Sequence, residues 1–217
     1  MGVQTLVSAH KKFKETHAKE YAEHFKKLAE EGQSPKTLFI SCSDSRVVPS
    51  LITHTKPGEL FIDRNIGNIV PPFREDTECS AVSASIEYAV NTLEVENIIV
   101  CGHTDCGACQ ALYKDMPASR DTVHIGRWLN FARNARDQAL AMVGKQNKKT
   151  LYTATERFNI IEQLKNLMSY PTVKANVLEG KLFIQGWYYH IENGDLEYFD
   201  PIEHRFKLLE EFTENQK

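Results

Sequence analysis

The sequence predicts an α/β fold with a mostly parallel central sheet flanked by helices and a long amphipathic helix at the N-terminus. Short apolar runs typical of buried strands occur at residues 37–40, 59–62 and 97–101. Segments with helical periodicity follow these runs along the chain. Strands that alternate with helices favour parallel pairing through right-handed crossovers, and such sheets bind ligands beyond the carboxyl ends of their strands.

The N-terminal helix is expected over residues 5–31. Its apolar stripe lies on a background rich in Lys and Glu and consists of Phe13, His17, Tyr21, Phe25 and Leu28. Gly32 ends the helix. A long amphipathic helix ahead of the core indicates docking on another surface.

The helices that follow the second apolar run are predicted from caps and spacing. Asp76-Thr77 can cap a helix that runs to Leu93, with apolar residues at helical spacing. Helical patterns recur over residues 122–142 and 155–169, and these segments separate the third predicted strand from the fourth.

The last part of the chain predicts a hairpin and a polar end. A strand begins at residues 181–184, and Asn193-Gly194 signals a tight hairpin into residues 196–199. Residues 200–217 are expected to form a polar helix and tail.

Composition favours one compact domain over residues 1–217 and excludes several classes of protein. The chain is 41% hydrophobic and 25% charged, and its net charge of −3 is spread without a basic stripe for nucleic acid or a polybasic patch for membranes. No apolar stretch approaches the roughly 18 residues of a membrane span. Five cysteines, an odd number, and the lack of a glycosylation sequon favour a reducing compartment, so a cytoplasmic location is expected.

A short motif at the end of the first predicted strand carries chemically reactive side chains. Cys42, Asp44 and Arg46 fall within five residues, so that a bidentate guanidinium can hold a carboxylate beside a sulfur. His103 and Cys106 follow the strand at 97–101. Cys and His are ligands that zinc prefers, and three of them leave a tetrahedral ion one open position, as in catalytic zinc sites.

A second arrangement of cysteines is compatible with the same sequence. Cys106-x-x-Cys109 has the spacing of a metal knuckle or a redox pair. Together with Cys42 and Cys101, these residues could form a closed four-cysteine site. Spacing alone does not decide between the closed site and the open one.

The motif from Cys42 to Arg46, followed by His103-x-x-Cys106, resembles the signature of the β-class carbonic anhydrases, which are zinc lyases. The resemblance covers residues 33–199 and preserves the order of the family's motifs. The further matching segments are Pro57-Gly58-Glu59, Arg64-Asn65-Ile66-Gly67-Asn68, Ile86-Glu87-Tyr88-Ala89-Val90, Val100-Cys101-Gly102-His103 and Gly186-Trp187.

The resemblance implies a role for each of these residues. Zn²⁺ would be bound by Cys42, His103 and Cys106, and would not be bound by Cys79, Cys101 or Cys109. Asp44 and Arg46 would form a catalytic dyad that orients zinc-bound hydroxide toward carbon dioxide, and the products would be bicarbonate and a proton. Residues 33–199 would be the catalytic core, with residues 1–31 as a helical arm.

The resemblance also implies a substrate pocket and a conditional role for Asp44. The pocket would consist of Gln33, Phe61, Ile66 and Tyr88. In some family members the Asp of the dyad moves onto the metal as a fourth ligand and closes the site. Phe39 stands where the bicarbonate-regulated branch has a Trp, so an open site is expected at neutral pH.

The expected partners are carbon dioxide, bicarbonate and further copies of the chain. By resemblance, the family forms homodimers, or dimers of dimers, in which the N-terminal helices embrace the partner. Two other functions fit the same residues. One is hydrolysis of carbon disulfide or carbonyl sulfide on the same scaffold, and the other is a non-catalytic zinc or thiol-redox protein that uses Cys101, Cys106 and Cys109.

Overall fold

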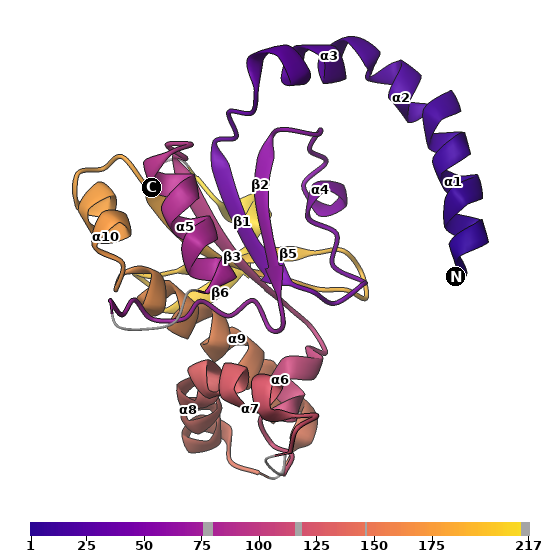
Figure 1. Ribbon diagram of the computed structural model, residues 1–217. Coiled ribbons are helices and arrows are strands. Elements are labelled where there is room, and N and C mark those ends of the chain that lie inside the picture. The colour runs from indigo at the N-terminus through magenta and orange to yellow at the C-terminus, as the bar shows by residue number, and fades with distance from the viewer. Residues whose placement is uncertain (76–79, 116–118, 146, 214–217) are drawn as a thin grey trace. The chain divides into compact units, whose positions relative to one another are not determined.

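The structure of the chain is a computed structural model, in which residues 1–75, 80–115, 119–145 and 147–213 are described (Figure 1). The chain forms two compact units, Met1–Ser34 and Pro35–Lys217. None of the described helices combines the length and the apolar composition needed to cross a bilayer.

The N-terminal unit contains three helices where the sequence predicts one. They are α1 (Val3–Glu15), α2 (His17–Glu20) and α3 (Ala22–Glu31). The predicted continuous helix is interrupted at Thr16 and Tyr21, whose backbone angles leave the helical region. The Thr16 hydroxyl donates to the Lys12 carbonyl at 2.9 Å, a local bond that competes with helix continuation. Gly32, at φ +79°, ends α3 as predicted.

The core unit is built on a six-stranded sheet in the order β2-β1-β3-β4-β5-β6 (Figure 1). The strands are β1 (Thr37–Cys42), β2 (Leu60–Asn65), β3 (Asn97–His103), β4 (Phe183–Tyr189), β5 (Leu196–Asp200) and β6 (Arg205–Leu208). The first four strands in the order pair in parallel, and β5 and β6 are antiparallel. The predicted mostly parallel sheet flanked by helices is confirmed.

Strand β1 lies at the centre of the apolar core. Leu38, Phe39 and Ile40 are fully buried, and because alternate side chains point to opposite faces, both faces of the strand are covered. The register pairs Cys42 with Asn65 of β2 and Ser41 with Cys101 of β3. The carboxyl ends of β1 and β3 therefore lie side by side, as predicted for the two segments that carry the candidate ligands.

Seven helices of the core unit are described. They are α4 (Pro49–Ile52), α5 (Ala81–Asn91), α6 (Gly107–Ala111), α7 (Val123–Leu129), α8 (Arg133–Val143), α9 (Lys148–Leu167) and α10 (Pro171–Leu178), and short 3-10 helices occupy Asn130–Ala132 and Leu209–Glu211. The longest, α9, packs against β3 and β4. Its approach depends on two glycines, because a Cβ at Gly102 or Gly186 would lie 2.8 Å or 2.5 Å from Ile160.

Several predicted boundaries differ from the structure. The proposed cap Asp76-Thr77 lies outside the described residues, and α5 is described from Ala81 to Asn91. Helix α9 begins seven residues before the predicted 155, because the Asn147 side chain caps it by accepting from the Thr150 amide at 3.2 Å. The hairpin at Asn193-Gly194 joins β4 to β5 as predicted, but its loop is longer than a two-residue turn.

The predicted C-terminal helix over residues 200–217 is wrong for the described part of that segment. Residues 205–208 form β6, which pairs with β5. The alternation of Arg205, Phe206, Lys207 and Leu208 suits a half-buried strand, and Phe206 contacts the Phe199 ring of β5 at 5.4 Å. Pairing with an existing sheet edge thus overrides a weak local preference for helix.

Candidate metal centre

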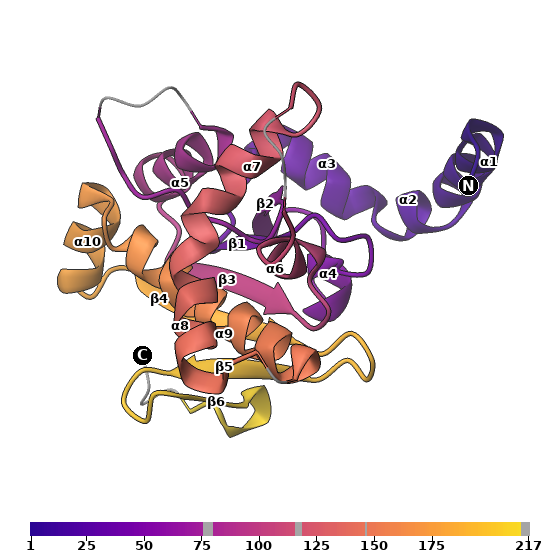
Figure 2. The ribbon, with the colours of Figure 1, turned by 90° about the horizontal axis from the view of Figure 1, so that it is seen from below.

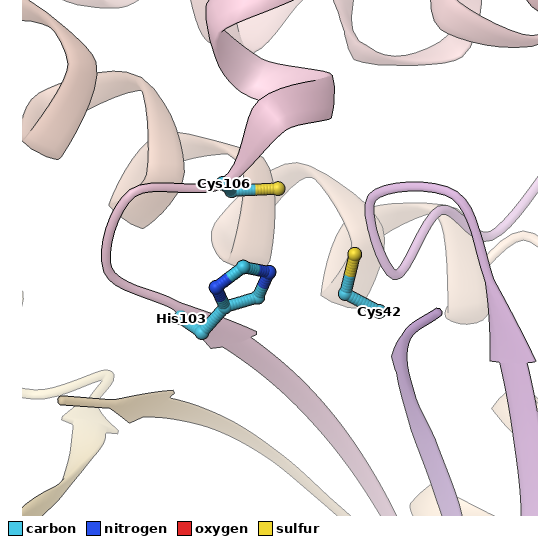
Figure 3. Close-up of side chains that lie close together, drawn as sticks. All are labelled: Cys42, His103 and Cys106. Atoms are coloured by element: carbon cyan, nitrogen blue, oxygen red, sulfur yellow. The ribbon is translucent and has the colours of Figure 1, made fainter. Parts of the chain in front are cut away.

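Three side chains converge at the carboxyl edge of the sheet (Figure 3). Cys42 ends β1, His103 ends β3, and Cys106 directly precedes α6. Their potential ligand atoms all lie within 4.8 Å of one another. A tetrahedral zinc ion with Zn–S bonds near 2.3 Å would hold two sulfurs about 3.8 Å apart, so small side-chain adjustments suffice to close the site.

The His103 ring is oriented for coordination. Its Nδ1 lies 2.8 Å from the Thr104 carbonyl, which can only accept, so Nδ1 carries the proton and Nε2 presents a lone pair. His103 is fully buried, and among the described residues Nε2 has no hydrogen-bond partner. A buried nitrogen without a partner is costly unless a cation meets it.

The two sulfurs also favour a cation between them. Cys42 Sγ accepts from the Gly67 amide at 3.4 Å, and both cysteines are almost fully buried. The hydrogen bond with Cys106, together with burial, raises the pKa of the Cys42 thiol to about 12. Two buried sulfurs so close together ionise readily only around a metal ion. Their chemistry and that of His103 fit zinc.

The remaining described cysteines are not part of the ligand group formed by Cys42, His103 and Cys106. Cys101 is fully buried in β3, and burial raises the pKa of its thiol to about 12. Cys109 is buried in α6 and packs in one cluster with Cys42 and Cys106, although its sulfur is not among the gathered ligand atoms. All four described cysteines are free, and the fifth, Cys79, lies outside the described residues. The described geometry thus gathers a histidine with two cysteines, and not four cysteines.

Asp44 and Arg46 form a bidentate ion pair beside the cluster. Arg46 Nε donates to Asp44 Oδ1 at 2.9 Å, and a terminal nitrogen donates to Oδ2 at 2.8 Å. These hydrogen bonds hold the pKa of Asp44 well below its usual range, so that the carboxylate is ionised at neutral pH. Arg46 also donates to the Asp105 carbonyl at 3.3 Å, which ties the pair to the turn between His103 and Cys106.

Arg64 fixes the backbone that carries this pair. Its guanidinium donates to the Cys42 carbonyl at 3.1 Å and to the Asp44 carbonyl at 2.6 Å. Within the sequence, Arg64 stands out only as part of a matching motif. The structure shows that it spans from β2 to the loop after β1.

Glu156 is a residue of this site that sequence reasoning missed. It lies in α9, is 2% exposed, accepts from the Cys106 amide at 2.9 Å and accepts from the Tyr188 hydroxyl at 2.7 Å. Burial raises its pKa to about 7. No local signal identifies it, because a Glu between Thr155 and Arg157 has the pattern of a solvent-exposed helix position.

Two of the four predicted substrate-pocket residues contact each other in the structure. The rings of Phe61 and Tyr88 lie 5.8 Å apart. Phe61 pairs with Leu38, four residues before Cys42, which is about 13 Å along a strand. Ile66 instead lines a cavity of about 650 Å³ that also borders Ser43. Gln33 belongs to the N-terminal unit, and its role stays a prediction.

The comparisons with known proteins point to one family. A family model described as carbonic anhydrase matches residues 37–196. The chain is 39% identical over 202 residues to a carbonic anhydrase of Helicobacter pylori, covering 92% of this chain and 91% of that protein. It is 44% identical over 195 residues to a carbonic anhydrase of Pseudomonas aeruginosa, covering 88% and 84%.

Solved structures agree with these relatives. The β-carbonic anhydrase CcaA superposes with a TM-score of 0.88 at 36% identity, over 94% of this chain and 91% of that one. One of two tetrameric β-carbonic anhydrases from Sordaria macrospora superposes with a TM-score of 0.77 at 29% identity, over 95% of each chain.

Proposed function

The chain belongs to the β-class carbonic anhydrases, and from that premise we propose that it hydrates carbon dioxide reversibly at a zinc ion held by Cys42, His103 and Cys106. The reaction converts carbon dioxide and water into bicarbonate and a proton. Zinc in such a site makes a nucleophile available from water at neutral pH. The protein must then orient that nucleophile, admit carbon dioxide and release an anion.

Asp44 is the group that we propose for orientation. Its carboxylate is an acceptor that can take a hydrogen bond from the attacking oxygen, so that a lone pair points at the carbon of carbon dioxide. Arg46 keeps Asp44 ionised and fixed, because both carboxylate oxygens are already bound to its guanidinium. This bidentate pair beside the Cys42–His103–Cys106 cluster is the observation that carries the proposal.

The same pairing bears on whether Asp44 also acts as a ligand. The group of metal-ligand atoms contains no oxygen from Asp44, whose side chain is engaged by Arg46. We propose that the site is open in this state and that closure by Asp44 requires the pair with Arg46 to break.

The test measures carbon dioxide hydration by stopped flow from pH 6 to pH 9, with zinc quantified on the same sample. Asp44→Asn should retain zinc and lower the turnover number by about 10²-fold, because the negative charge and the bidentate pairing with Arg46 that orients the acceptor are lost. Asp137→Asn is the matched control, since Asp137 forms an exposed pair with Arg136 at 2.8 Å outside the site. Wild-type turnover in Asp44→Asn, or zinc-free protein with full activity, would refute the assignment.

Rates on carbonyl sulfide and carbon disulfide belong to the same experiment. Faster turnover of either sulfur compound than of carbon dioxide would show that the scaffold serves the alternative hydrolase reaction. Absence of hydration in zinc-loaded protein would instead favour a non-catalytic role.

The assembly and location are further proposals. A solved relative from Sordaria macrospora is tetrameric by its description. We propose that this chain forms at least a homodimer and acts in the cytoplasm. Sedimentation of the zinc-loaded protein as a 24.8 kDa monomer at micromolar concentration would contradict the first point.

A further inference from the structure

Residues from the end of α8, from α9, and from β5, β6 and the turn between them line a second concave surface of the core unit. These helices and strands are labelled in Figure 2. This groove has a volume of about 590 Å³, within the range of small-molecule sites. None of the metal-centre residues lines it. Its apolar wall includes Phe158, Ile161, Phe199 and Phe206.

The charged lining of the groove is entirely basic. The charged or titratable side chains that line it are Lys149, Arg157, His204 and Arg205, and no Asp or Glu lines it among the described residues. Arg157 is paired with Glu197 at 2.6 Å, and Arg205 with Glu203 at 2.7 Å. Lys149 has no ion pair with any described residue. A chain with a net charge of −3 thus keeps an uncompensated cation at the rim of an apolar groove.

One wall of the groove is rigid and aromatic. The Arg157 guanidinium lies 4.5 Å from the centre of the Tyr188 ring and 4.8 Å from that of Phe206. This stacking and the pair with Glu197 fix Arg157 as part of the wall. Lys149, in the first turn of α9, is exposed and free to turn toward a ligand.

We propose that this groove binds a small carboxylate with an apolar body, such as a medium-chain fatty acid. The apolar body would lie among the phenylalanines, and the carboxylate would meet Lys149. Charge complementarity favours an anionic ligand, and the wall favours an apolar one. The chain's own last residues, Glu214 to Lys217, do not suit the groove because they carry no apolar side chain.

Calorimetric titration of the zinc-loaded protein with octanoate tests the proposal, with octan-1-ol as the uncharged analogue. Lys149→Glu should weaken octanoate binding about fivefold, as expected for loss and reversal of one exposed charge. Lys148→Glu is the matched control, because Lys148 lies in the same turn of α9 and does not line the groove. Ala154→Trp places an indole inside the groove and should weaken binding at least about tenfold.

The carboxylate of octanoate could also bind the zinc ion, so the binding stoichiometry alone does not show where octanoate binds. The effects of the three variants on its affinity do. Carbon dioxide hydration by the three variants should equal that of the unmodified protein, which separates this proposal from the proposed function. Equal weakening by Lys148→Glu and Lys149→Glu would overturn the proposal, as would equal affinity for octanol and octanoate. A lower sedimentation coefficient for Ala154→Trp would show that a second copy of the chain occupies the groove, and would also overturn it.

Discussion

Replacing Glu156 tests whether a carboxylate on α9 supports Cys106, one of the three proposed metal ligands. In Glu156→Leu, the Cys106 amide and the Tyr188 hydroxyl lose their buried acceptor, at 2.9 Å and 2.7 Å respectively. Each buried donor left unsatisfied costs about 1–3 kcal/mol, so the two together cost about 2–6 kcal/mol.

Glu156→Gln is the matched control for this substitution. The amide oxygen can still accept from Cys106, and its NH₂ can donate to the Tyr188 oxygen once the hydroxyl turns. Both variants remove the charge of the buried carboxylate, so the free-energy cost of desolvating that charge is absent from both and does not affect the difference between them. The difference in unfolding free energy between Gln and Leu therefore reports the two hydrogen bonds.

Urea unfolding of the zinc-loaded proteins at pH 7 measures this difference. Competition with a chelator provides the second readout, because a loosened Cys106 should release zinc more readily in Glu156→Leu than in Glu156→Gln. Indistinguishable unfolding midpoints and zinc retention for the two variants would refute the reasoning, since the contacts would then stabilise neither the fold nor the site.

Three further predictions concern the frame around the site. Gly186→Ala should destabilise the fold by about 1–3 kcal/mol in urea unfolding, because its Cβ would lie 2.5 Å from the Cγ2 atom of Ile160. An undiminished unfolding midpoint would contradict the packing argument. Arg64→Ala should lower zinc retention and the rate of carbon dioxide hydration together, since Arg64 donates hydrogen bonds to two backbone carbonyls of the site. Arg64→Lys should not restore either quantity, because a single ammonium lacks the separate N–H donors of the guanidinium. The hydrogen bond from Lys207 lowers the pKa of Asp200 to about 2, so the stability that the ionised carboxylate contributes is present above about pH 4 and is lost as the pH falls toward 2. The unfolding midpoints of the wild type and Asp200→Asn should therefore converge over that pH range. A constant difference between them would contradict the predicted pH dependence.

The sequence predicts the ligand arrangement because the relevant information is local. Cys42 and His103 each follow a buried strand, and parallel pairing brings such ends to one edge of a sheet. Asp44 and Arg46 are two residues apart, so their bidentate contact needs only a turn. The fold class follows in the same way from alternating apolar runs and helical segments.

Local patterns mislead where packing decides. The N-terminal stripe has helical spacing throughout, but the helix is broken at Thr16 and Tyr21. The polar C-terminal segment has a free sheet edge beside it and forms β6. Phe61 and Tyr88 contact each other and Ile66 lines a cavity beside Ser43, while their common role in a substrate pocket stays a prediction.

The fold class, the Cys-His-Cys set and the adjacent ion pair could thus be predicted from residue patterns, since each depends on residues near strand ends or near one another. The contacts behind Cys106 could not. Glu156 is 50 positions from Cys106 and 32 from Tyr188 along the chain, and the three meet because two glycines let α9 approach β3 and β4 closely. Contacts over such separations arise from packing, which residue patterns along one segment do not encode.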